Sequence, residues 1–119
     1  PEVIAFLDAK PVFPGHTLIV PHQHLETLEE VDDELAGKLL SAGRRVAAAQ
    51  RVALGADGSF LGLNDRVSQS VPHVHLHVVP RRRGDGLRGF FWPRVRYEHA
   101  DHAAQVAAAL RGALAGSAQ

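Results

Sequence analysis

Residues 70–81 read SVPHVHLHVVPR and place three histidines, His73, His75 and His77, at every second position of an apolar run. Side chains on a β-strand alternate between its two faces, so a strand over residues 73–79 puts all three imidazoles on one face. The apolar residues between them then point the other way, toward the core. With a rise of about 3.3 Å per residue, neighbouring imidazoles are expected roughly 6–7 Å apart.

A row of imidazoles could face solvent or hold a metal ion. Solvent exposure does not explain why all three positions are histidine, because Thr, Lys or Glu would be equally suitable on a solvent-facing strand surface. Neutral imidazole is a common metal ligand, and three such nitrogens make a catalytic zinc site. The first and last histidines of the row are separated by about 13 Å along a flat strand, however. A metal would therefore need other ligands, for which His16 or His24 are candidates.

The third interpretation is nucleophilic catalysis, in which one neutral imidazole attacks phosphorus and forms a covalent phospho-histidine. That chemistry needs hydrogen-bond donors for the phosphate oxygens. The neighbouring sequence supplies them in Gln69 and Ser70 before the row, Arg81 after it, and Asn64 at the end of the preceding strand. This combination favours phosphate chemistry over a metal site.

Composition bounds the class of protein. The chain has 119 residues, with 13 basic and 13 acidic side chains, which predicts one globular domain over residues 1–119 and no preference for polymeric nucleic acid. No Cys is present, so a disulfide framework and a thiolate metal site are excluded. Nothing approaches the roughly 20 apolar residues of a membrane span, and no signal peptide is visible. We therefore expect a cytoplasmic protein without a membrane partner, and the strand-like start without Met suggests that an N-terminal segment is missing.

Periodicity and turn residues predict six elements and one irregular loop. Gly55 and Gly58 are expected to end the long helix. The predicted segments are strands over 3–7 and 17–20, a helix over 25–54, strands over 59–64 and 73–79, a basic aromatic loop over 81–96, and a helix over 98–115. The order β-β-α-β-β-α indicates an α+β domain with helices packed on an antiparallel sheet.

The histidine row resembles the signature of the histidine triad (HIT) nucleotide hydrolases and transferases. HVHLHVV followed by PR matches the triad itself, and SQSV before it is similar to the family's Gly-Gln-Ser/Thr-Val. A second block, VIAFLDAKPVFPGHTLIVPHQH, resembles the family's first motif and supplies His16 as a fourth histidine. The two blocks agree with the family in order and spacing, although Ser68 stands where Gly is common and the turn from Asn64 to Gln69 is short.

The resemblance implies an antiparallel sheet with two flanking helices, extended across a homodimer, and a reaction at the α-phosphate of a nucleotide. His75 is then the nucleophile, and a carbonyl that holds its Nδ1–H would leave Nε2 to attack. His77 would contact the scissile phosphate and the leaving group, while His73 and His16 support the triad through hydrogen bonds. No cofactor and no metal ligand is assigned.

The resemblance also implies nucleotide-binding residues. Asp8 falls where a ribose-binding residue is expected, three polar residues fall around the phosphates (Asn64, Gln69 and Ser70), and two apolar residues line the base side (Phe6 and Leu18). Phe6 and Leu18 could equally be plain core residues, because apolar strand positions usually are.

We therefore predict a nucleotidyl hydrolase that cleaves a dinucleoside polyphosphate or a nucleoside phosphoramidate and releases a nucleoside monophosphate. A nucleotide phosphorylase or transferase with the same intermediate is the alternative enzyme; the retained His77 disfavours the transferase branch, which often has Gln there. A non-catalytic purine-nucleotide-binding protein and a metalloprotein are the alternatives from other classes. The basic loop over 81–96 is hypothesised to recognise the leaving half of a polyphosphate or to close over the partner subunit.

Overall fold

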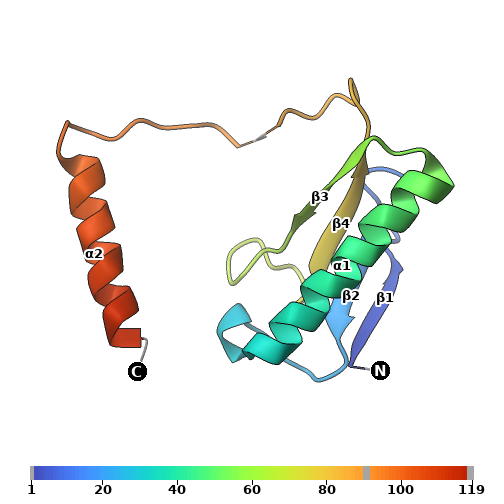
Figure 1. Ribbon diagram of the computed structural model, residues 1–119, viewed down its shortest axis with the longest axis horizontal. Coiled ribbons are helices and arrows are strands. Elements are labelled where there is room, and N and C mark those ends of the chain that lie inside the picture. Colours follow the sequence, from blue (N-terminus) through green and yellow to red (C-terminus); the bar gives the residue numbers. More distant parts are fainter. Residues whose placement is uncertain (1, 90–91, 118–119) are drawn as a thin grey trace. The chain divides into compact units, whose positions relative to one another are not determined.

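A computed structural model describes residues 2–89 and 92–117 (Figure 1). The chain divides into two compact units, one up to Gly86 and one from Leu87, and each is described by itself. The first unit holds β1 (Val3–Leu7), β2 (Thr17–Pro21), the 3-10 helix η1 (Leu28–Glu30), α1 (Asp33–Leu54), β3 (Gly58–Gly62) and β4 (Leu76–Arg81), and the second holds α2 (His102–Ser117). This is the predicted element order, and the α+β class with an antiparallel sheet and two helices is confirmed.

The four strands form one antiparallel sheet in the order β1-β2-β4-β3. β4 is central, so His77 pairs with Leu18 of β2 on one side and with Gly62 of β3 on the other. The block that contains His16 and the histidine row are about 60 residues apart in sequence, and their pairing makes them neighbouring strands. This pairing brings His16, at the start of β2, next to the histidines.

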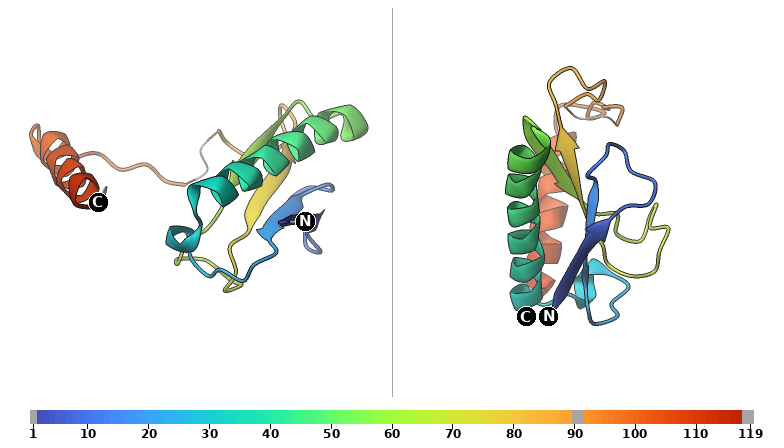
Figure 2. Two further views of the ribbon diagram at one scale, coloured as in Figure 1. Left: turned by 60° about the horizontal axis from the view of Figure 1, so that its bottom comes forward. Right: turned by 90° about the vertical axis from the view of Figure 1, so that its right-hand side faces the viewer.

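Helix α1 lies across one face of the sheet (Figures 1 and 2). The core between them contains Ile19 of β2, Leu39 of α1 and the three apolar residues that alternate with the histidines. Those three side chains, Val74, Leu76 and Val78, are at most 7% exposed, as the alternating pattern predicts. The histidines therefore lie on the face that α1 does not cover.

Gly43 lets α1 approach the sheet closely. A Cβ atom at this position would lie 2.8 Å from Leu61 Cδ2 and 3.1 Å from Leu76 Cδ2, both in the packed core. We expect Gly43→Ala to lower the free energy of unfolding by about 1–3 kcal/mol, because the extra methyl group overpacks this contact. Gly37→Ala, in the same helix with nothing within 4 Å of its Cβ position, is expected to stabilise by about 0.5–1 kcal/mol. Urea denaturation of both variants checks this pair, and equal effects of the two substitutions would contradict the close approach.

The long helix begins later than the predicted residue 25. Residues 28–30 form η1 instead, where Thr27 and Glu30 make a capping box, and α1 starts after Asp32, whose carboxylate accepts a hydrogen bond from Leu35 N at 2.8 Å. The apolar spacing of Leu28 and Val31 continues the helical period, so the pattern alone did not reveal the break. The predicted end is confirmed, because Gly55 caps the helix in the left-handed conformation with φ 67°.

Strand boundaries also shift by a few residues. β3 covers Gly58–Gly62 rather than residues 59–64, and β4 starts at Leu76, so His73 and His75 precede the strand. The C-terminal helix spans His102–Ser117 rather than 98–115. Among the described residues, no helix is both long enough and apolar enough to cross a membrane. The packing of α2 on the sheet and the extension of the sheet across a homodimer stay predictions.

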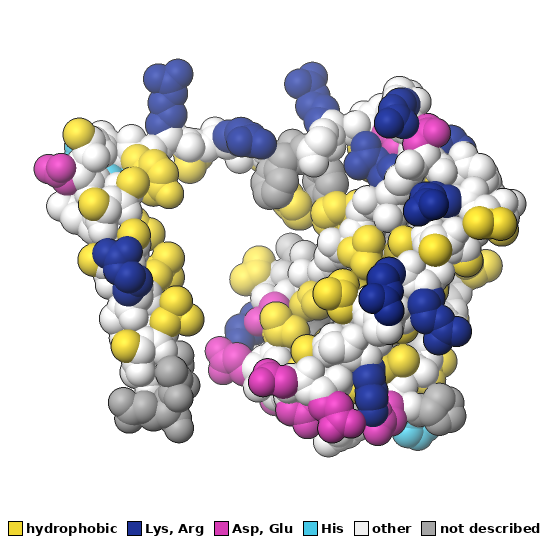
Figure 3. All heavy atoms as spheres, in the orientation of Figure 1, with side chains coloured by type: hydrophobic (Ala, Val, Ile, Leu, Met, Phe, Trp, Pro, Cys, Tyr) yellow, Lys and Arg dark blue, Asp and Glu magenta, His cyan; other side chains and the backbone are white. Residues whose placement is uncertain are grey.

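Charged side chains are unevenly distributed along α1. Acidic residues gather where η1 and the first turn of α1 lie, and basic residues are more frequent farther along the helix (Figure 3). Asp33 and Glu34 occupy the first turn and Arg51 the last. This distribution complements the helix dipole and stabilises the helix without any ligand.

Candidate active site

The histidine face opens onto a cleft of about 570 Å³. β1, β2, β4 and the segment before β4 contribute its walls, which combine an apolar side with polar groups. The lining residues are Phe6, Asp8, Leu18, Val20, Ser70, Val71, His73, His75 and His77. Seven of these are residues that the sequence predicted for the site.

The histidines lie closer together than an extended strand predicts. The ring centroids of His75 and His77 are 5.1 Å apart, against the expected 6–7 Å, because His75 precedes the regular part of β4 and the rings incline toward each other. The alternation nevertheless continues through this segment, with half-buried histidines between buried apolar residues. The cleft therefore receives two imidazoles at a separation that one phosphate group can bridge.

The ring of His75 is oriented by a main-chain carbonyl. Its Nδ1 lies 2.7 Å from the carbonyl oxygen of His73, which can only accept a hydrogen bond. Nδ1 of His75 must therefore carry the proton, and Nε2 keeps a lone pair for the cleft. This is the tautomer that a nucleophilic imidazole needs.

The ring of His77 has the opposite arrangement. Val12 N donates to Nδ1 of His16 at 3.1 Å, so a neutral His16 carries its proton on Nε2. His16 Nε2 lies 2.9 Å from His77 Nδ1, which must accept that hydrogen bond. His77 is then neutral with its proton on Nε2. Of the two histidines that line the cleft, His75 keeps a lone pair on Nε2 and His77 carries an N–H group there.

The environment of His16 and His77 keeps both imidazoles neutral. Burial lowers the pKa of His16 below its usual value of 6.5, although the nearby Asp8 carboxylate acts in the opposite direction. Burial also lowers the pKa of His77, and the neighbouring His75 and His16 lower it further. Both shifts agree with hydrogen bonds that require unprotonated acceptor nitrogens.

These pKa shifts predict that acid weakens the fold. Histidines in the unfolded chain take up protons near pH 6.5, whereas His16 and His77 stay neutral to lower pH in the folded chain. The unfolded state then binds more protons, so the free energy of unfolding should fall as the pH drops from about 7 through this window, and the loss should level off below the folded pKa values.

Urea denaturation at pH 7.5 and 5.5 measures this effect. His77→Asn should lose part of the pH dependence, whereas the exposed His22→Asn should keep the dependence of the original protein. A His77→Asn variant with an unchanged pH dependence would contradict the assignment.

The HIT domain model matches residues 1–84. This chain belongs to the HIT family. The HIT chain is 40% identical over 86 residues to an uncharacterised HIT-like protein of Mycobacterium tuberculosis, an alignment that covers 71% of this chain and 60% of that protein. The chain thus spans about three fifths of that relative's length.

Solved structures of HIT proteins share the fold. A Zn-bound histidine triad family protein from Mycobacterium smegmatis has 38% identity and a TM-score of 0.70, covering 78% of this HIT chain and 69% of that one. A HIT family member from Bacillus subtilis has 30% identity and a TM-score of 0.79, with 94% and 82% covered.

Two related proteins of Schizosaccharomyces pombe carry named activities. One is an asymmetrical bis(5'-nucleosyl)-tetraphosphatase, 34% identical with 68% of this HIT chain and 46% of that protein covered. The other is an adenosine 5'-monophosphoramidase, 33% identical with 76% and 66% covered. At the level of the family, these relatives support a nucleotide hydrolase.

Two predicted phosphate ligands of the HIT site do not line the cleft. Gln69 is turned into its own loop, where Oε1 accepts from Arg66 N at 2.9 Å and Nε2 donates to Glu26 O at 2.6 Å. Asn64 is exposed and is not among the lining residues. In the short turn between these two residues, Ser68 adopts a left-handed φ of 59°, at the position where the family commonly has Gly. Ser70 does line the cleft.

His24 contacts the histidine row, although the sequence suggested it only as a possible metal ligand and not as a partner of His73. Its Nδ1 lies 3.1 Å from Nδ1 of His73, whose Nε2 donates to the carbonyl oxygen of Pro21 at 2.9 Å. Val74 N donates to Leu25 O at 2.7 Å beside this pair. These contacts hold the segment before β4, and with it the carbonyl that orients His75. The sequence feature that could have indicated this contact is the position of His24 shortly after β2, the strand that pairs with β4.

The start of the basic loop lies away from the cleft. Arg81 is at the opposite end of β4 from His77, roughly 13 Å along the strand. Its guanidinium forms a bidentate ion pair with Asp85, with distances of 2.6 and 3.1 Å, and Arg82 donates to the last carbonyl of α1 at Leu54. These arginines therefore stabilise a corner of the fold. Phe90 and Phe91 of the loop lie outside the described residues.

Among the described residues, one group of possible metal ligands lies close enough together to hold a metal ion. Ligand atoms of Asp8, His16 and His77 are all within 4.8 Å of one another. A metal would need the Nε2 lone pair of His16, but the hydrogen bond from Val12 N places the proton on that nitrogen. The residues present therefore do not fit a metal while this hydrogen bond is made.

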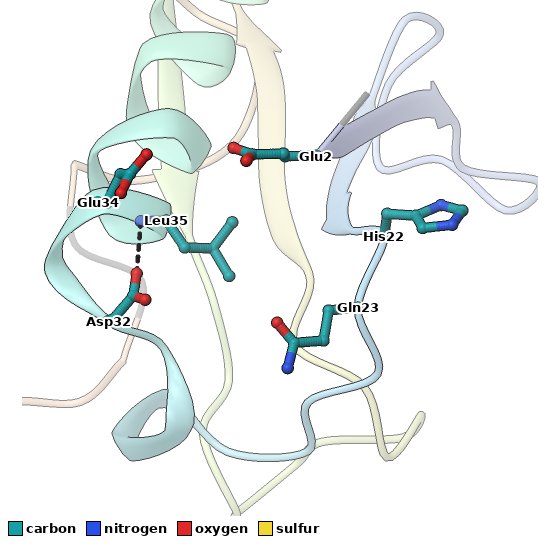
Figure 4. Close-up of a pocket in the computed structure, with 6 residues that line it drawn as sticks. All are labelled: Glu2, His22, Gln23, Asp32, Glu34 and Leu35. Atoms are coloured by element: carbon teal, nitrogen blue, oxygen red, sulfur yellow. Dashed lines mark hydrogen bonds between the residues drawn. The ribbon is translucent and has the colours of Figure 1, made fainter.

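A second hollow of about 280 Å³ lies between the N-terminal strand and α1 (Figure 4). It is lined by several carboxylates, but these have partners: Asp32 caps the helix through Leu35 N, and Glu2 and Glu34 both pair with Lys38. The His22 ring points away from Asp32 and Glu34 (Figure 4). The acidic side chains of this hollow are explained by the fold.

Proposed function

We propose that this HIT protein is a nucleotidyl hydrolase that cleaves nucleotide conjugates at the α-phosphate through a covalent nucleotidyl-histidine. One observation carries the proposal. His75 and His77 line the same cleft, and Nε2 of His75 has a lone pair whereas Nε2 of His77 carries a proton. A nucleophile and a donor for phosphate oxygen are what such a displacement requires. The named activities of the two yeast relatives support the same reaction class.

In the first step, the Nε2 lone pair of His75 forms a bond to the α-phosphorus. The bond from phosphorus to the leaving group breaks, and its electron pair departs with that group. A polyphosphate leaves as an anion, whereas the amine of a phosphoramidate also takes up a proton from solvent as its bond to phosphorus breaks. His75 becomes cationic without losing a proton, and its Nδ1–H bond to the His73 carbonyl strengthens as the charge appears.

In the second step, water attacks the same phosphorus. The P–N bond breaks, its electron pair returns to Nε2 of His75, and the water proton passes to solvent. The product is a nucleoside monophosphate. Inorganic phosphate in place of water would yield a nucleoside diphosphate, which is the phosphorylase alternative.

The remaining lining residues bind the nucleotide. Asp8 accepts hydrogen bonds from the ribose, Ser70 donates to phosphate, and Phe6 and Leu18 contact the base. Asn64 and Gln69 have no binding role in this proposal, because neither side chain lines the cleft. The homodimer belongs to the same proposal and rests on family membership, whereas a cytoplasmic location stays a prediction from the sequence.

The proposal is tested by measuring AMP release in the presence of EDTA. We expect AMP from both diadenosine tetraphosphate and adenosine phosphoramidate, and the formation of ADP on addition of inorganic phosphate would indicate the phosphorylase. Release that disappears with EDTA and returns with a divalent metal would contradict a metal-independent nucleophile.

A further inference from the structure

The loop between β1 and β2 contacts His16 through a main-chain amide. Residues 8–16 read DAKPVFPGH, and only the ends of this segment, Asp8 and His16, belong to the site. Within the loop, the Val12 side chain is 52% exposed, yet its backbone N–H is directed at Nδ1 of the buried His16. A main-chain group of the loop thus contacts the histidine network from behind.

Val12 N–H stands at the start of a directed chain of hydrogen bonds. A backbone N–H can only donate, so His16 Nδ1 must accept, and the proton of neutral His16 must lie on Nε2. His16 Nε2 then donates to His77 Nδ1, and the proton of neutral His77 must lie on Nε2. Reversing any one of these bonds would leave a donor facing a donor or an acceptor facing an acceptor.

We propose that the backbone amide of Val12 is a positioning group that selects the Nε2–H tautomer of His77. This inference rests on the proposed function, in which that N–H donates to the substrate phosphate. The amide touches no substrate and acts only through His16. The loop between the two strands therefore contributes to catalysis by main-chain geometry rather than by a side chain.

The surroundings hold this geometry in place. Asp8 N donates to His16 O at 2.9 Å, and His16 N donates to Phe13 O at 3.0 Å, so the loop closes on itself at both ends. The carbonyl of Gly15 accepts from the Gln50 amide of α1 at 3.0 Å. Because His16 is only 4% exposed, water has little access to replace the Val12 amide. One hydrogen bond of ordinary strength changes a tautomer ratio by about tenfold.

The first test is the tautomeric state of the original protein, read from ¹⁵N chemical shifts and long-range ¹H–¹⁵N couplings of the imidazoles. We expect protons on Nε2 of His16 and His77 and on Nδ1 of His75 at neutral pH. A proton on Nδ1 of His77 would overturn the proposal without any variant.

The second test removes the amide proton. Val12→Pro should shift the His77 signals toward a mixture of tautomers, whereas Val12→Ala, which keeps the N–H, should show the original pattern. We expect the kcat of Val12→Pro to lie about twofold below that of Val12→Ala, with little difference in KM. A tenfold change in the tautomer ratio, from about 10:1 to about 1:1, nearly halves the fraction of His77 that carries its proton on Nε2. Equal spectra for the two variants would overturn the proposal. If Val12→Pro does not fold, an amide-to-ester replacement at residue 12 removes the same proton.

The two proposals fail in distinguishable ways. A protein that shows the expected tautomers but releases no AMP would contradict the proposed function and leave the positioning of His77 intact. A protein that releases AMP with His77 protonated on Nδ1 would contradict the positioning group and leave the hydrolase intact.

Discussion

His75→Ala is expected to reduce AMP release from either substrate by at least about a thousandfold, because the variant has no nucleophile and cannot form the covalent intermediate. His75 is half-buried on the cleft wall, and its ring is held by one hydrogen bond to the His73 carbonyl. Removal of the side chain leaves the apolar face of the segment unchanged, so the fold should persist. Steady-state kinetics at pH 7.5, together with a circular dichroism spectrum, measure the two properties.

His22→Ala is the matched control for this loss. His22 is an exposed histidine at the end of β2, and it does not line the cleft. Its removal should leave kcat/KM within about twofold, as expected for a surface substitution. A His75→Ala variant that retains more than a few per cent of the activity would exclude His75 as the nucleophile.

Gln50→Leu is expected to lower the free energy of unfolding by about 1–3 kcal/mol. The amide nitrogen of Gln50 donates to Gly15 O and to Val78 O, each at 3.0 Å, from a side chain that is 4% exposed. Leu fills a similar volume but leaves the buried Val78 O without this donor, which costs about 1–3 kcal/mol. Gly15 O still accepts a hydrogen bond from the Thr17 hydroxyl at 2.9 Å. Urea denaturation at neutral pH measures the difference.

Gln23→Leu provides the comparison, because Gln23 is exposed and the same replacement there should change stability by less than about 0.5 kcal/mol. Gln50 also connects α1 to the residues that precede His16 and follow His77. A Gln50→Leu variant as stable as Gln23→Leu would show that Val78 O finds another partner, and would contradict the support that Gln50 gives to the site.

Local patterns were enough to predict the elements that carry the site. The alternation of His73, His75 and His77 with apolar residues correctly placed the imidazoles opposite the helix-covered face, although regular pairing starts only at Leu76. The turn residues between residues 8 and 17 correctly separated two strands. Such signals are local, because they depend on side-chain direction and backbone preference within a few residues.

The partners of individual polar groups could not be predicted in the same way. The His16–His77 and His24–His73 contacts join residues 61 and 49 positions apart, and they exist only once β2 and β4 pair. Gln69 looked like a phosphate ligand because it precedes the triad, but the short turn directs its amide to Arg66 and Glu26. The role of the Val12 amide leaves no trace in the sequence, since every residue except Pro carries a backbone N–H.

The covalent step itself can be observed directly by rapid-quench mass spectrometry. Mixing the protein with diadenosine tetraphosphate and quenching within the first turnover should give a species heavier by one adenylyl group, and peptide mapping should place that group on His75. The adduct should be absent from His75→Ala. AMP release with no adduct at any quench time, or an adduct on a different residue, would contradict His75 as the nucleophile.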